Sequence, residues 1–306
     1  FILRRFSHMS GTVSVLSWED EDLGRIGKFG PVTNSKEDAN NIVWPAALIL
    51  DSDENLIISD DGRHRINFLS QDGEFIDSWG ENGSKPGQLD RPSGIALDAD
   101  ENIYVVDTLN NRIQKFTKDG RFISMWGSHG TNPGEFDMPW GIHIDEIGDV
   151  YVVDWRNDRV QKFTSEGEFL FGFGSKGNDD GQFDRPGGIA VDKDGDIYVA
   201  DIGNNRIQVF DHDGHYVQKF IGDGLMSPSG RIYMLSNARE MRLREMSHME
   251  QERKFRSPRS VRVNSRGQMF VADYHCSRIQ IYQKDAIPLD EGQIWAPVRA
   301  PSLLMP

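Results

Sequence analysis

The 306-residue sequence contains a single cysteine, Cys276, so no disulfide can form within the chain. No apolar run approaches the roughly 20 residues that a membrane helix needs. The first residues, "FILRRFSHMSGTV", place their arginines after the apolar start, the reverse of the order in a signal peptide. These absences exclude a disulfide-stapled fold and leave no visible membrane or export segment. The compartment therefore stays open.

Positive charge is also scarce, because 34 lysines and arginines face 48 acidic residues and the formal net charge is −14. A strongly acidic chain is poorly suited to electrostatic capture of nucleic acid. The segment 228–266 is the exception, with ten basic and four acidic residues. Single-stranded RNA binding through this segment is kept as a third hypothesis, although few aromatic residues lie among its arginines.

What the sequence has is a repeat of 47 residues, marked by a proline, an aspartate 15 positions later and an arginine 20 positions later. Pro258 carries Asp273 and Arg278 at the same two offsets, although it lies 72 residues after Pro186. A repeat that covers most of the chain predicts one closed array of units. The regular members are Pro45, Pro92, Pro139 and Pro186, then Asp60, Asp107, Asp154 and Asp201, then Arg65, Arg112, Arg159 and Arg206.

One repeat, residues 92–138, divides into four β-rich runs separated by polar turns and followed by a longer loop. Four antiparallel strands of this kind form one meander, and meanders stacked radially form a propeller. Large aromatic residues recur at the end of the fourth run, where they predict the core between neighbouring sheets. They are Trp79, Trp126, Phe173 and Phe220.

These patterns predict an all-β fold, a six-bladed β-propeller of four-stranded antiparallel blades. The 72-residue spacing is interpreted as two repeats that have lost 22 residues. We expect a strand at 22–30 to complete the last blade and close the ring. The predicted domains are an N-terminal extension or processing remnant (1–21), the propeller (22–287) and a C-terminal tail (288–306). The repeats are expected to start near 45, 92, 139, 186, 223 and 258.

The combination of "PGGIAVD" (186–192), "DGDIYVAD" (194–201), "NNRIQVF" (204–210) and a terminal "WG" (126–127) resembles the NHL repeat. The resemblance extends over roughly residues 22–283. It implies a module that binds protein or RNA, an extracellular sensor domain of a bacterial kinase, or a peptidylglycine α-amidating lyase.

The lyase would imply a zinc ion held by histidines directly after the repeat prolines. Here those positions hold Ala46, Ser93, Trp140, Gly187 and Arg259. None of these side chains offers an imidazole ligand, so the zinc site of that enzyme is absent and no metal ligands are predicted.

The recurring aspartate and arginine are interpreted as scaffold, since five copies of one dyad around a ring would share no substrate. The segments "DSDEN", "DADEN" and "DKDGD" resemble half of a calcium loop but fit tight turns equally well, and we interpret them as turns. No cofactor is predicted, and a calcium or other metal in the channel stays open as an alternative.

Function is sought where the repeats differ, because structural demands are shared by all blades. The residues after the prolines and after the aspartates are expected to line the same mouth of the central channel. An aromatic and cationic set there would hold an anionic or planar ligand by stacking and charge. The candidate binding residues are Trp140, Trp155, Arg156, Arg185, Arg259, Arg262, Tyr274 and Asp61. The alternative is that Trp140 and His143 pack into the neighbouring blade and the arginines pair with the acidic excess.

Two functional hypotheses use this mouth. The first is a non-enzymatic, monomeric module that binds a protein partner or a small anionic ligand. The second is a hydrolase or lyase, with His143 or His275 as the base and Arg156 or Arg259 stabilising a developing anion. The two differ in whether an imidazole lies in reach of those arginines.

Overall fold

The computed structural model describes residues 42–222, 254–276 and 278–284, and the backbone of the strands at 3–7, 12–16 and 22–26. In these residues every sheet is antiparallel and joins strands that follow one another in sequence. Four sheets have four strands and two have three, which confirms the all-β prediction. In the part of the chain that is described, no helix is long and apolar enough to cross a membrane.

The four-stranded sheets follow the 47-residue repeat. Their strands are β4 (Pro45–Leu50), β5 (Leu56–Asp60), β6 (Arg65–Leu69), β7 (Phe75–Trp79), β8 (Pro92–Leu97), β9 (Ile103–Asp107), β10 (Arg112–Phe116), β11 (Phe122–Trp126), β12 (Pro139–Ile144), β13 (Val150–Asp154), β14 (Arg159–Phe163), β15 (Phe169–Phe173), β16 (Pro186–Val191), β17 (Ile197–Asp201), β18 (Arg206–Phe210) and β19 (Tyr216–Phe220). Two short 3-10 helices follow second strands, namely η2 (Asp61–Arg63) and η3 (Thr108–Asn110). The three-stranded sheets are β1 (Leu3–Ser7), β2 (Thr12–Leu16) and β3 (Asp22–Ile26), and β20 (Pro258–Val263), β21 (Gln268–Asp273) and β22 (Arg278–Gln283).

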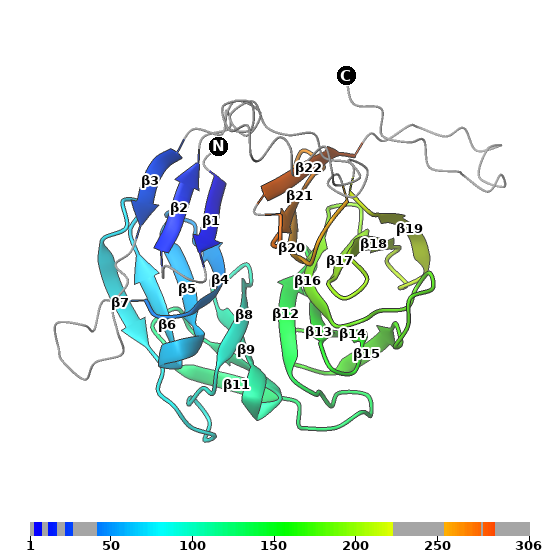
Figure 1. The fold of residues 1–306 in the computed structure, drawn as a ribbon. Coiled ribbons are helices and arrows are strands. Elements are labelled where there is room, and N and C mark those ends of the chain that lie inside the picture. Colours follow the sequence, from blue (N-terminus) through cyan, green and yellow to red (C-terminus); the bar gives the residue numbers. More distant parts are fainter. Residues whose placement is uncertain are drawn as a thin grey trace.

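The sheets pack face to face through their first strands. β4 lies against β8, β8 against β12, β12 against β16 and β16 against β20. The fourth strands, β7, β11, β15 and β19, lie at the periphery (Figure 1). The arrangement is that of a β-propeller, with the first strands nearest the axis.

The core lies between neighbouring sheets, as the recurring aromatic residues predict. Tyr104 and Val106 of one sheet meet Ile142 of the next, and all three are almost completely buried. Trp126 lies between Tyr104 and Phe163, with 6.0 Å between ring centroids on each side. Because these faces have no other cover, each sheet is stabilised mainly by its neighbours, at roughly 1.5–3 kcal/mol per buried large side chain.

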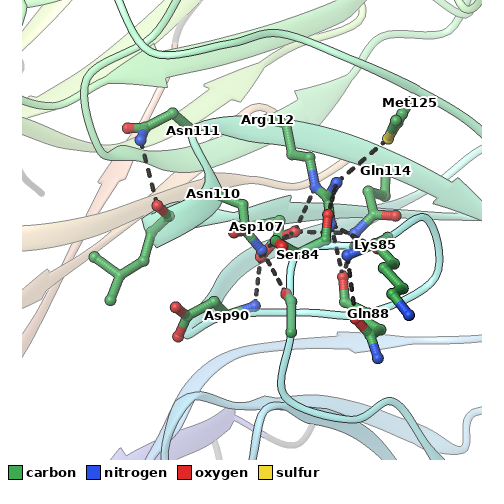
Figure 2. A network of polar contacts seen from close by, with 12 residues as sticks. Ser84, Lys85, Gln88, Asp90, Asp107, Asn110, Asn111, Arg112, Gln114 and Met125 are labelled. Carbon is green, nitrogen blue, oxygen red and sulfur yellow. Dashed lines mark hydrogen bonds and ion pairs between the residues drawn. The ribbon is translucent and has the colours of Figure 1, made fainter.

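A buried polar network joins each second strand to the loop that precedes its sheet (Figure 2). Asp107 accepts hydrogen bonds from Arg112 Nε at 2.7 Å and from the backbone N–H of Asp90 at 2.6 Å. The side-chain amides of Asn110 and Gln114 also donate to this carboxylate. The other guanidinium N–H groups donate to three carbonyl oxygens of the loop, those of Ser84, Lys85 and Gln88. The motif therefore fastens the long loop to the second and third strands of the sheet.

The same carboxylate and guanidinium pair recurs in the later sheets. The Nε to Oδ2 distance is 2.8 Å for Arg159 and Asp154, and 2.7 Å for Arg206 and Asp201. Burial raises the pKa of Asp154 above its ordinary value, and the hydrogen bonds from Asn157, the Asp137 backbone and Arg159 offset only part of that effect. The interpretation of the repeated pair as scaffold is confirmed.

A second set of bonds joins each sheet to the next through a residue in the left-handed conformation. Asn111 has a φ of 53°, and its Oδ1 accepts the backbone N–H of Met138 at 2.8 Å. Two repeats later, Asn205 accepts the backbone N–H of Ser257 at 2.8 Å. Asparagine tolerates positive φ better than most residues, which suits it to this turn. The bond from Ser257 makes β20–β22 the sheet next to β16–β19.

The interpretation of the 72-residue spacing was therefore wrong. The blade predicted to start near 223 falls on residues 223–253, outside the described residues, and β20 packs directly on β16. Lys284 Nζ also lies 2.7 Å from Asp192 Oδ2 across the same pair of sheets. The spacing is one repeat with 25 additional residues. A distance between two motifs does not distinguish a shortened pair of repeats from one repeat with an insertion.

The prediction that the N-terminal strand at 22–30 completes the last blade was also wrong, because that strand pairs within a different sheet. β3 pairs with β2 in the sheet β1–β3, whereas β20–β22 form a sheet of three strands. Residues 1–21, predicted as an extension, contain β1 and β2. The alternating valines of "TVSVL" (12–16) are the signal for β2, and they lack the repeat motif that identified the other strands. The count of six blades stays a prediction.

The acidic turns between first and second strands are Asx turns, as interpreted. Asp98 Oδ1 accepts the backbone N–H groups of Asp100 and Asn102, at 3.0 and 2.8 Å. Its other oxygen pairs with Lys115 Nζ at 3.0 Å. Among the residues that the structure describes, no group of three or more histidine, cysteine or acidic side chains is arranged to hold a metal ion.

Loss of a scaffold aspartate should destabilise the propeller strongly. Asp154→Ala would leave the Arg159 guanidinium and the Asp137 N–H without their acceptor, so we expect the free energy of unfolding to fall by about 3–5 kcal/mol. Urea unfolding followed by tryptophan fluorescence measures this change. Asp119→Ala removes an exposed pair with Arg121 and should change the stability little. Equal losses in the two variants would contradict the assignment.

The insertion should be dispensable for the fold. A variant that lacks 25 residues between Gly222 and Lys254 restores the 47-residue spacing, and the backbone bond from Phe255 N to Ile221 O, 2.8 Å, already brings the loop ends together. We expect a single thermal transition within a few degrees of that of the full chain. Loss of cooperative unfolding would show that the segment is needed for packing.

Candidate functional site

The residues that follow the repeat prolines and aspartates meet at one end of the first two strands of each sheet. The register fixes this, because Pro139 is directly opposite Asp154 in the β12–β13 pair. Trp140 and Trp155 are therefore neighbours, with ring centroids 6.3 Å apart and planes inclined by 42°. The Trp140 backbone is held by the preceding sheet, since its carbonyl accepts the Ser93 hydroxyl at 2.9 Å.

Two arginines lie against Trp155. The guanidinium carbon of Arg156 is 5.8 Å from the ring centroid and that of Arg185 is 5.7 Å from it. We call Trp140, Trp155, Arg156 and Arg185 the tryptophan–arginine cluster. Arg156 has Asp137 as a distant ion-pair partner at 3.8 Å. Arg185 is exposed and has no carboxylate within ion-pair distance among the residues described in 42–284.

The same two positions hold an ion pair two repeats earlier. Arg91 corresponds to Arg185, and Asp61 corresponds to Trp155. Arg91 makes a bidentate contact with Asp61, at 2.6 and 2.9 Å, and lies 5.7 Å from the ring centroid of Trp44. Asp61 of the β4–β7 sheet thus neutralises Arg91. In the β12–β15 sheet the Trp155 ring takes the place of this carboxylate, so the positive charge of Arg185 is not neutralised there.

A second exposed group lies on the last sheet. The Arg259 guanidinium stacks on the Tyr274 ring at 3.8 Å, and the His275 ring meets Tyr274 edge-on at 5.2 Å. All three residues are exposed. The structure brings these three residues together in a group separate from the tryptophan–arginine cluster, whereas the sequence analysis placed Arg259 and Tyr274 in one set with Trp140 and Trp155. In the described chain, no carboxylate lies within ion-pair distance of Arg259.

His143 and Arg262 lie apart from these groups. Each is four positions beyond its repeat proline, on the first strands β12 and β20. Burial, and to a smaller extent the charge of Arg262, lower the pKa of His143 to about 3, although a hydrogen bond with the Val191 backbone opposes them. The imidazole is therefore neutral at pH 7 and is a weak base.

The sequence analysis missed two residues of the same region. Arg91 and Trp44 complete the ion-paired group around Asp61. Arg91 was detectable, because it precedes Pro92 as Arg185 precedes Pro186. Most of the basic segment 228–266, the candidate for RNA binding, lies outside the described residues.

Comparison with protein-family models gives two matches. The NHL repeat model matches residues 183–210, and a model described as a 6-bladed beta-propeller matches residues 96–167. The chain therefore contains a segment that matches the NHL repeat within a β-propeller fold. No match was found among curated protein sequences.

Solved structures show the same propeller fold. A streptogramin B lyase has a TM-score of 0.56 at 16% identity, over 94% of this chain and 80% of the lyase chain. A catalytically inactive virginiamycin B lyase from Staphylococcus aureus, solved with quinupristin, gives 0.55 at 14%, over 90% and 78%. A protein of unknown function from Bacteroides thetaiotaomicron gives 0.61 at 21%, over 92% of this chain and 66% of that one. At these identities the likeness concerns the fold alone.

The lowered pKa of His143 should appear in the pH dependence of stability. Between pH 6.5 and about 3 the unfolded imidazole binds a proton that the folded one does not, so stability falls as the pH falls through this window. His143→Gln removes that contribution. As the pH falls, the free energy of unfolding of the variant should decrease less steeply than that of the unmodified protein, and the two slopes should differ by up to about 1.4 kcal/mol per pH unit. Urea unfolding at several pH values measures the slopes. Parallel curves for the two proteins would contradict the prediction.

Proposed function

We propose that the end of the propeller formed by the tryptophan–arginine cluster binds a ligand in which an anionic group is next to a planar one. The observation that carries the proposal is the replacement of the Asp61 carboxylate by the Trp155 ring at the position facing Arg185. A guanidinium without a carboxylate, held beside an indole, offers charge and a stacking surface together.

The surroundings support this ligand class. Arg156 adds a second positive charge to the Trp155 ring, and its only described acidic neighbour, Asp137, is 3.8 Å away. Trp140 offers a second ring at 6.3 Å, inclined to the first. Because the net charge of the chain is −14, an anion gains little from the overall field and depends on these local groups.

We favour binding over hydrolase or lyase chemistry at this site. Streptogramin B and virginiamycin B lyases share the fold at 14–16% identity, which transfers no residue roles to this chain. Of the two candidate bases, His143 has a pKa of about 3 and is too weak a base for efficient proton abstraction at neutral pH. We therefore propose recognition without a catalytic step.

The test is a matched set of three probes measured by isothermal titration calorimetry. 2-Naphthoate is planar and anionic, 2-naphthylmethylamine is planar and cationic, and cyclohexanecarboxylate is anionic but not planar. We expect 2-naphthoate to bind best. Trp155→Ala and Arg185→Gln should each weaken its binding by about tenfold, the scale of one desolvated cation–π contact.

Arg91→Gln is the matched control, because Arg91 occupies the same position two repeats earlier but is already paired with Asp61. Its affinity for 2-naphthoate should equal that of the unmodified protein. Equal binding of the three probes, or equal losses in Arg91→Gln and Arg185→Gln, would overturn the proposal.

A further inference from the structure

A second cationic position lies on the first strands, away from the tryptophan–arginine cluster. The strands β12, β16 and β20 pack side by side near the centre of the propeller (Figure 1). At the fourth residue after each proline they carry His143, Ala190 and Arg262. The Arg262 side chain reaches back from β20 to β16. Its Nη1 donates to the Ile189 carbonyl oxygen at 3.3 Å, and its charge acts on His143.

Arg262 differs from the scaffold arginines in having no acidic partner. Arg112, Arg159 and Arg206 each lie within 2.8 Å of a buried aspartate. In residues 42–222, 254–276 and 278–284, no carboxylate lies within 4.0 Å of the Arg262 guanidinium. The long contact with the Ile189 carbonyl engages one of its five N–H donors.

Protein surrounds the charged end of Arg262. The residue as a whole is exposed, but burial of the guanidinium lowers its pKa below the ordinary value. Both properties are expected for a side chain on the axial face of a propeller. An arginine keeps its charge in such a place, and an unpaired charge surrounded by protein is costly. The neutral His143 supplies no compensating negative charge.

We propose that Arg262 binds a small oxyanion, a carboxylate or a phosphate group, on the axial face of β16 beside His143. The guanidinium presents parallel N–H groups that match two oxygens of such an anion. The site is distinct from the tryptophan–arginine cluster, because its residues lie three positions further along the strands than Trp140 and Arg259. The inference does not depend on the proposed function of that cluster.

The test measures thermal unfolding at pH 7 while sodium phosphate, or in a second series sodium acetate, replaces sodium chloride at constant ionic strength. For the unmodified protein we expect the Tm to rise by about 2–4 °C when the better anion reaches roughly ten times its Kd. The series with the larger rise distinguishes a phosphate from a carboxylate ligand. The Hε1 resonance of His143 in the proton NMR spectrum should shift with the same Kd, since the anion binds beside the ring.

Arg262→Met keeps the length of the aliphatic part and removes the charge. It should abolish the rise in Tm, and without added anion it should be at least as stable as the unmodified protein, because an unpaired charge is gone. Arg121→Gln, which removes a charge from an exposed side chain, is the control and should retain the full response. Trp155→Ala should retain it too, which separates this site from the tryptophan–arginine cluster.

The proposal is overturned if neither anion raises the Tm of the unmodified protein. It is also overturned if Arg262→Met responds as the unmodified protein does. A third outcome combines two results: Arg262→Met is less stable than the unmodified protein at every anion concentration, and the His143 resonance of the unmodified protein does not shift. In that case Arg262 serves only the contact with Ile189, and the anion site is overturned as well.

Discussion

The structure depends on one buried carboxylate at the end of the second strand of each sheet. Asp60, Asp107, Asp154, Asp201 and Asp273 are all almost completely buried. Each accepts a backbone N–H from the segment that leads into its own first strand, and in the later sheets the following arginine carries the contact on to the loop. Because this group fixes where the first strand begins, it also fixes where the side chains beside the repeat proline lie.

The geometry of the tryptophan–arginine cluster follows from that constraint. Since Pro139 is opposite Asp154, the residues after both must be neighbours, and Trp140 meets Trp155. The contact with Arg185 needs the next sheet as well, and the left-handed Asp158 supplies it by accepting the Arg185 backbone N–H at 2.6 Å. The tryptophan–arginine cluster thus stands on hydrogen bonds that are common to the repeats, while the side chains at its positions differ from repeat to repeat.

This explains how far the sequence predicts the molecule. Strands and turns of the repeats were predictable because alternation and the turn residues are local signals, and the pairing of Trp140 with Trp155 followed from the repeat register. The packing of the β20–β22 sheet directly on the β16–β19 sheet was not predictable, because the number of residues between two motifs carries no information on which sheets are in contact. The strand β2 was not predicted, because its sequence lacks the repeat motif. The contact of Arg262 with the Ile189 carbonyl of the neighbouring sheet was not predictable, because the path of a long side chain between sheets has no local sequence signal.

The bonds between β16–β19 and β20–β22 have a consequence for the continuity of the chain. Asn205 holds Ser257, and Lys284 reaches Asp192, Asp194 and Asp196, all without using the connecting peptide. Apolar packing of Val261 and Met269 against Tyr198 adds to these contacts. The order of the sheets in space is therefore maintained by noncovalent contacts at this seam. A chain nicked there by a protease would persist as two associated fragments, and the seam is a natural place for new termini or an inserted domain.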